Sequence, residues 1–180
     1  MTDLAQLNSA QIVERIGETD QQFLTEPTAT LAKTRAQLRI KLVEFSHQKK
    51  EQLYFLTEAV VLLETALMQA CNLQEHLELS AALGEAYLSF YQYTKEQRYM
   101  VISKQVLKAL SHYDSPVILL ALARLSAFEG HAALVRHWLT RLLRLPEADF
   151  QFMDSIKQAP ELSTHIQQDW FKQLLQQKLH

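Results

Sequence analysis

The chain has 180 residues, which is enough for one domain with a sizeable core or at most two small ones; one domain spanning residues 1–180 is the favoured prediction. Hydrophobic residues make up 48% of the chain and charged residues 21%, as in ordinary globular proteins, while only three glycines and four prolines leave little material for sheets and tight turns. The net charge of −2 provides no general attraction to nucleic acid, so no nucleic-acid partner is expected.

The sequence also lacks the usual signs of export or membrane insertion. It holds a single cysteine, which excludes an intramolecular disulfide, and it begins without a basic segment followed by an apolar run. No apolar stretch reaches the roughly 18 residues that a membrane span needs. We therefore expect a cytoplasmic protein with no membrane partner.

The N-terminal part predicts three helices. Apolar residues favour a helix over residues 3–16 with Gly17 as its stop, and residues 1–27 form an N-terminal arm. Thr28 or Thr30 is suited to cap a second helix that runs to about Gln48. The third helix, residues 51–70, is apolar over most of its circumference, which predicts other helices on both of its sides.

The stretch from Leu77 to Pro116 predicts a helical hairpin with a close helix contact. Its first helix contains Leu83-Gly84-x-x-Tyr87. Glycine costs about 1 kcal/mol relative to alanine inside a helix, so Gly84 indicates a place where a neighbouring helix approaches closely. Ser115 can cap the next helix, with Pro116 at its first position.

A further hairpin and a helical tail follow. Gly130 is placed to separate the two helices of this hairpin, which ends at about Pro146. Residues 147–180 are predicted to be capping helices, the first opened by Pro146 and extending through Gln158, with a break at Ala159-Pro160 before the last. The predicted fold is therefore all-α.

The pattern of Leu83, Gly84 and Tyr87, followed by small and apolar residues and by Pro116, resembles the tetratricopeptide repeat (TPR). The resemblance covers about residues 51–146 in a degenerate form. It implies antiparallel helical hairpins over residues 28–146, stacked as a short right-handed solenoid with extra N- and C-terminal helices.

The TPR resemblance further implies a non-enzymatic module or adaptor that binds a peptide or protein segment in a concave groove. The groove candidates lie on the first helix of the hairpin that starts near Leu77 and on the first helix of the next hairpin, on the face turned away from the second helix of each. They are Glu78, Ala81, Glu85, Leu88, Val117, Leu120, Arg124 and Phe128. One alternative is a holding chaperone that resembles the TPR-like chaperones of bacterial secretion systems and dimerises through residues 1–27. Another, of a different class, is a metal-dependent or hydrolytic enzyme.

The sequence contains no pattern that is typical of a catalytic, cofactor or metal site. His131 and His137 are six residues apart and so point in different directions on a helix, and Cys71 has only His76 nearby in the sequence. We expect no catalytic residue, no cofactor and no metal ligand, and we expect Cys71 to fill a small interhelical space.

The densest basic cluster lies between residues 136 and 144 and includes Arg136, His137, Arg141 and Arg144. Two interpretations stay open. The cations stabilise the C-terminal end of a helix, or they form a binding site for an acidic peptide.

Overall fold

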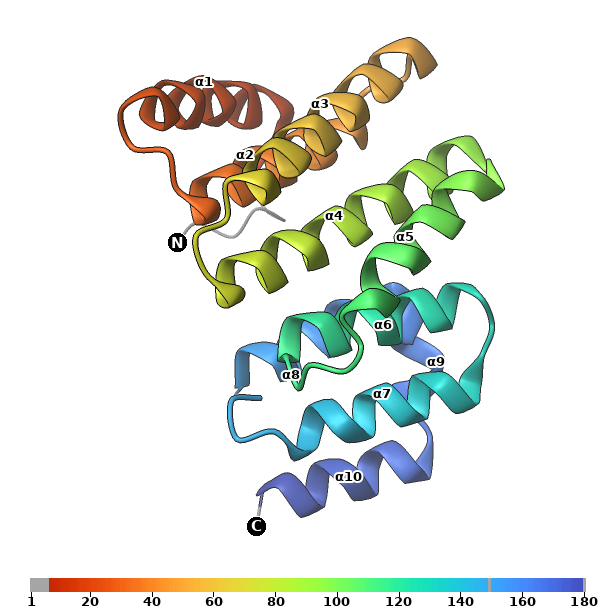
Figure 1. Cartoon of the computed structure of the whole chain (residues 1–180). Helices are drawn as coiled ribbons and strands as arrows, with labels where there is room; N and C mark the ends of the chain where they lie inside the picture. The colour runs from red at the N-terminus through yellow and green to blue at the C-terminus, as the bar shows by residue number, and fades with distance from the viewer. Residues whose placement is uncertain (1–6, 149, 180) are drawn as a thin grey trace. The chain divides into compact units, whose positions relative to one another are not determined.

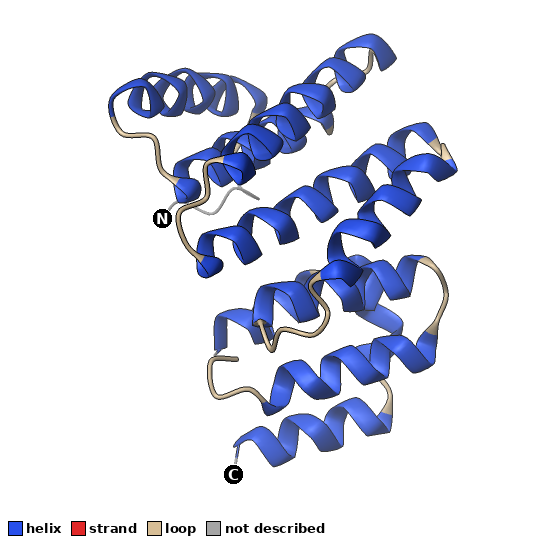
Figure 2. Ribbon diagram, viewed as in Figure 1, coloured by secondary structure: helices blue, strands red, loops and turns tan. Residues whose placement is uncertain are grey.

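The computed structural model describes residues 7–148 and 150–179, and over these residues the protein is built from helices without a strand (Figure 2). The all-α prediction is confirmed. The chain divides into two compact units, Met1–Ser103 (unit 1) and Lys104–His180 (unit 2), and the division falls inside helix α5. That the two units form a single domain stays a prediction. Within the described ranges, no helix is both long and apolar enough to span a membrane.

Unit 1 is organised around its second helix (Figure 1). Its elements are α1 (Ser9–Thr25), α2 (Ala29–Val43), α3 (Lys49–Met68), α4 (Leu73–Thr94) and the beginning of α5 (Gln97–Ala109). Helix α2 packs against α1, α3 and α4, and α3 also packs against α4. Helix α3 therefore has a helix on each side, as its sequence predicted.

Helix α1 differs from the prediction at both ends. It begins at Ser9, where Asn8 and Gln11 form a reciprocal capping box with two hydrogen bonds of 3.0 Å; residues 3–6 of the predicted helix lie outside the described residues. The helix continues through Gly17 to Thr25, so the predicted stop at Gly17 is wrong. The modest penalty of one helical glycine is offset because the turns beyond it bury Thr19 and bring Asp20 against α2.

Helix α2 begins as predicted and ends early. The Oγ1 atom of Thr28 accepts a hydrogen bond from the Leu31 amide at 3.2 Å, which confirms Thr28 as the cap. The helix ends at Val43 rather than near Gln48, because the amides of the next three residues bond back three positions in a tight turn. The side-chain amide of Gln52 then donates to the Ser46 carbonyl at 2.7 Å and holds this turn against the start of α3.

The place of Gly84 agrees with a close helix contact. Gly84 is buried in α4, and its carbonyl oxygen accepts a hydrogen bond from the Ser103 Oγ of α5 at 2.7 Å. Two residues of α4, Phe90 and Tyr87, stack with Tyr99 of α5 at centroid distances of 4.5 and 6.4 Å. The hairpin of α4 and α5 is thus held by a hydrogen bond and by stacked rings.

Unit 2 is a hairpin closed by the helices of the tail. It contains the end of α5, then α6 (Pro116–Phe128), α7 (Ala132–Arg144), α8 (Phe150–Gln158), η2 (Pro160–Leu162), α9 (Ser163–Ile166) and α10 (Asp169–Leu179). Its core joins both hairpin helices to the tail through fully buried side chains that include Leu119, Leu139, Ile156 and Leu162. The tail therefore completes the core of this unit.

Most of the helix ends and turns predicted for unit 2 are confirmed. Pro116 is the first residue of α6, Gly130 has a φ of +74° in the turn before α7, and α8 ends just before Ala159. Ser115 precedes α6, but its side chain makes no capping hydrogen bond. Pro146 does not open a helix: α8 runs over Phe150–Gln158, and residue 149 lies outside the described residues.

The burial of α3 makes a stability prediction. Leu63 is fully buried in α3, so Leu63→Ala should lower the free energy of unfolding by roughly 2–5 kcal/mol through lost burial and a cavity. Val61 lies on the same helix with 52% of its surface exposed, so Val61→Ala should change it by less than about 0.5 kcal/mol. Urea denaturation of both variants tests this, and equal effects would contradict the orientation of α3.

Candidate partner-binding surfaces

The four groove candidates of unit 1 lie on α4 and differ in accessibility. Ala81 and Leu88 are only 6% and 4% exposed, so little of either side chain is open to a ligand. Glu78 is partly exposed, and Glu85, also partly exposed, has an interaction partner of its own. Helix α4 thus offers mainly carboxylates to a ligand and little of its two apolar candidates.

The four candidates of unit 2 lie on α6, and all are partly buried. Leu120 packs against the core of this unit. Arg124 forms an ion pair with Glu161 of η2, a residue whose side chain is largely buried. Two of the four therefore already serve the packing of unit 2.

Unit 1 brings α2 and α4 together through an ion pair that the sequence did not indicate. The Lys33 Nζ donates to the Glu78 carboxylate at 2.8 Å, and the Gln74 side-chain amide donates to the other carboxylate oxygen at 2.9 Å. Hydrogen bonding from Lys33 holds the pKa of Glu78 below its usual value. Thr30 and Gln37 share the Lys33 side of α2 by helical spacing and are exposed. We call the surface formed by Thr30, Lys33, Gln37, Gln74 and Glu78 the α2–α4 face.

A second feature of unit 1 is a surface cleft of about 410 Å³, lined by residues of α1, α2 and α3. One of its lining residues is Arg39 of α2, whose side chain is only 7% exposed. Arg39 donates from Nη2 to Asp20 of α1 at 2.7 Å and from Nε to Glu58 of α3 at 3.0 Å. Arg35 donates to the other oxygen of Asp20 at 2.7 Å, and Tyr54 donates its hydroxyl proton to Glu58 at 2.8 Å.

The charged side chains of this cleft neutralise one another, which indicates that they hold helices together. Burial alone would raise the pKa of Asp20, but hydrogen bonds from Arg39 and Arg35 outweigh it and lower that pKa. Burial likewise disfavours the charged form of Arg39, and its hydrogen bonds to Asp20 and Glu58 raise its pKa instead. Two guanidiniums and two carboxylates thus satisfy one another and connect α1, α2 and α3.

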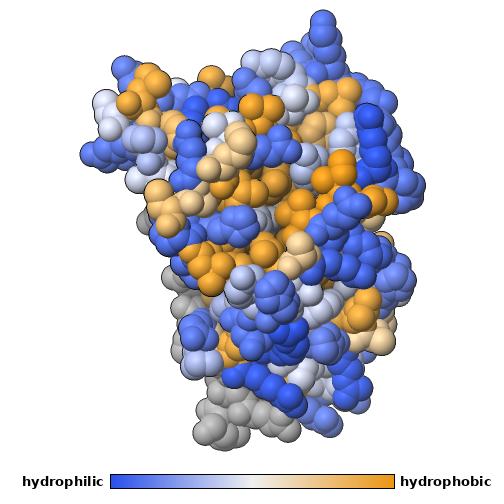
Figure 3. Space-filling view, in the orientation of Figure 1, coloured by the Kyte–Doolittle hydropathy of each residue, from blue (hydrophilic) through white to orange (hydrophobic). Residues whose placement is uncertain are grey.

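Cys71 and the remaining surface of unit 1 provide weaker candidates for a functional site. Cys71 is exposed, so the expectation that it fills an interhelical space is wrong; it lies after the C-terminal end of α3, beside a hollow of about 160 Å³. In the part of the chain that the structure describes, no three His, Cys, Asp or Glu side chains gather as a metal site would require. Apolar surface is visible over unit 1 in Figure 3, and the exposed stripe of Tyr54, Val61 and Met68 on α3 contributes apolar side chains to its surface.

Comparisons with protein-family models, with curated proteins and with solved structures find no significant match to this chain.

The role of Arg39 can be tested by removing its charge. Arg39→Met keeps the aliphatic stem but leaves Asp20 and Glu58 without their shared cation, so it should lower the free energy of unfolding by about 1–3 kcal/mol. Denaturation at neutral pH measures this loss. The control is Arg15→Met on α1, where the exposed ion pair with Glu18 at 3.5 Å should contribute less than about 1 kcal/mol. Equal losses would contradict a structural role for the Arg39 network.

The lowered pKa of Asp20 makes a pH prediction. A carboxyl group whose pKa is lower in the folded state stabilises the fold above its unfolded pKa, and this contribution is lost as the pH falls through the folded pKa. The stability difference between wild type and Asp20→Asn should therefore be full above about pH 5 and shrink from near the ordinary value of 3.8 downward. Denaturation from pH 7 to pH 2 tests it, with Asp154→Asn on the exposed surface of α8 as a control that should show no such change.

Proposed function

We propose that this protein is a non-enzymatic protein-interaction module, built as a short TPR-like right-handed solenoid of antiparallel helical hairpins, that binds a peptide or protein segment. The observation that carries the proposal is the packing of α2. This helix contacts α3, its own hairpin partner, and also α4, the first helix of the next hairpin. Such contact between successive first helices is what stacked helical repeats require, because each repeat packs on its neighbour.

The α2–α4 face is the surface that this stacking leaves for a partner in unit 1. Lys33 and Glu78 keep 27% and 28% of their side chains accessible, so both charges can contact a ligand without parting. The exposed Thr30, Gln37 and Gln74 add hydrogen-bond donors and acceptors that suit the backbone of an extended peptide. A polar or charged segment is the ligand that this chemistry fits.

The alternative of a holding chaperone that dimerises through residues 1–27 has less support, because the inner side of the described arm is already occupied within unit 1. The described part of the arm is α1, which packs on α2 and whose Asp20 pairs with both Arg35 and Arg39. Ile12 of α1 is fully buried in a cluster with Leu38 and Leu42 of α2. Release of α1 would leave these apolar residues and a buried arginine without their partners.

A charge exchange across the α2–α4 face tests the proposed function. Lys33→Glu alone should weaken the fold by up to about 1 kcal/mol, because two carboxylates then face each other. The double variant Lys33→Glu/Glu78→Lys restores an ion pair and should melt close to wild type. A partner that contacts the α2–α4 face should bind the double variant at least about ten-fold more weakly than it binds wild type, a loss of about 1.4 kcal/mol in binding free energy.

The measurement is affinity capture from the native cell with mass spectrometry, followed by binding of the recovered partner to each purified variant. The matched control exchanges the exposed pair of α1 as Arg15→Glu/Glu18→Arg and should bind like wild type. Undiminished binding by the Lys33→Glu/Glu78→Lys protein would exclude the α2–α4 face. Failure of the wild-type protein to retain any specific partner would contradict the module itself.

A further inference from the structure

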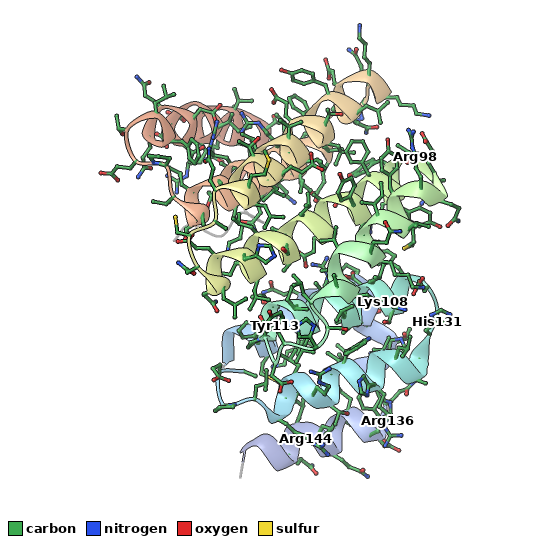
Figure 4. All side chains as sticks on the ribbon, viewed as in Figure 1. Arg98, Lys108, Tyr113, His131, Arg136 and Arg144 are labelled. Atoms are coloured by element: carbon green, nitrogen blue, oxygen red, sulfur yellow. The ribbon has the colours of Figure 1, made fainter. Side chains whose placement is uncertain are left out.

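Helix α7 of unit 2 presents two arginines that no carboxylate of the described residues neutralises. The helix contains no acidic residue, and Arg136 and Arg144 are exposed on it (Figure 4). His137 is exposed as well. Over residues 7–148 and 150–179, no ion pair joins Arg136 or Arg144 to a carboxylate, whereas Arg141 donates to Asp114 at 2.7 Å. The two exposed arginines are therefore available to an external anion.

Stabilisation of the helix end does not account for all of this charge. Arg141 and Arg144 lie in the last turn of α7, where cations interact favourably with the helix dipole. Arg136 is the fifth residue of the thirteen, one turn from the start, where the dipole offers a cation no advantage. The position of Arg136 therefore has no explanation in helix stability.

Two arginines of this helix, Arg136 and Arg141, each lie over the ring of one of the two tryptophans of the chain. The guanidinium carbon of Arg136 lies 5.7 Å from the ring centroid of Trp170 on α10, and that of Arg141 lies 5.5 Å from Trp138. Arg141 also donates to the Ser111 carbonyl at 3.0 Å. A guanidinium stacked on a ring keeps N–H groups at its edge for a carboxylate and loses less side-chain freedom on binding.

The charge of unit 2 distinguishes among anionic partners. Residues 104–180 contain nine lysines and arginines against seven acidic residues, an excess too small for general attraction to a nucleic-acid backbone or an anionic membrane. Asp114, 66% exposed beside Arg141, would also repel a continuous line of phosphates. A few carboxylates at defined places suit this pattern better.

The geometry points to α7 as a docking surface for an acidic segment of another protein, whose carboxylates pair with Arg136 and Arg144. Eight residues of helix separate these arginines by about 12 Å. An extended peptide rises about 3.3 Å per residue, so its acidic residues would be spaced about four apart. This surface lies within unit 2 and does not depend on the proposed role of the α2–α4 face.

Intrinsic fluorescence provides a direct test, because Trp170 lies beside Arg136 and Trp138 lies on α7 itself, beside Arg141. The full-length protein is titrated with a synthetic 12-residue peptide that carries two glutamates four positions apart in a Gly/Ser background. We expect a saturable change in tryptophan emission whose affinity falls as salt is added. The same peptide with glutamine in place of glutamate should cause no saturable change.

Variants then assign the effect to the arginines. Arg136→Gln should weaken peptide binding by about ten-fold, and Arg136→Gln/Arg144→Gln should abolish the saturable change. Arg136→Lys keeps the charge but loses bidentate pairing, and it should have an intermediate affinity. The matched control Arg15→Gln in unit 1 should bind like wild type, and circular dichroism should show equal helix content for every variant.

Three results would overturn the proposal. One is equal binding of the glutamate and glutamine peptides. Another is wild-type affinity in the Arg136→Gln/Arg144→Gln protein. The third is tighter binding of a thymidine oligonucleotide or of anionic phospholipid vesicles than of the acidic peptide in the same assay. A loss of capture by the Lys33→Glu/Glu78→Lys protein has no bearing on these outcomes.

Discussion

A buried guanidinium on the central helix sets the arrangement of unit 1. Charged groups enter a protein interior only when they are paired and hydrogen-bonded, and Arg39 meets this condition with one carboxylate from α1 and another from α3. The third contact, from Nη1 to the Arg35 carbonyl at 3.2 Å, remains within α2. Apolar burial supplies most of the stability of such a unit, but any sliding of α1 or α3 along α2 would separate these charges. The network therefore defines the register of three helices.

This register leaves another side of α2 for α4. Helix α2 uses Arg39 toward its two neighbours in the cleft and Lys33 toward Glu78 of the next hairpin. The same helix thus connects two successive hairpins through two separate sets of charges. Function in stacked hairpins depends on such first helices lying together, because their shared surface is larger than one helix alone can present to a peptide. The proposed interaction module follows from this arrangement and not from any single reactive residue.

In unit 2 the amphipathic helix α7 both contributes to the core and presents a proposed binding surface. The apolar residues Val135, Leu139 and Leu142 of α7 are fully buried in the core that the tail completes. The remaining surface of the helix carries arginine, histidine and partly exposed tryptophan. Burial of one side of α7 therefore directs the basic side outward, and α10 places Trp170 beneath Arg136. Packing of the C-terminal helices both completes the core and orients the proposed docking surface.

The sequence by itself determined the class of fold and most of the helix positions, because these depend on neighbouring residues. Helical periodicity, the cap at Thr28, the proline that opens α6 and the turn at Gly130 are local features. The stop predicted at Gly17 was wrong, since contacts from the following turns outweigh a local penalty. Only the tertiary structure decided that Ala81 and Leu88 are buried, that Lys33 meets Glu78 and that Arg39 joins three helices. Lys33 and Glu78 are 45 positions apart, and no local pattern records which faces of two distant helices will meet. The packing of whole helices decides which faces meet, because each buried charge has to be paired.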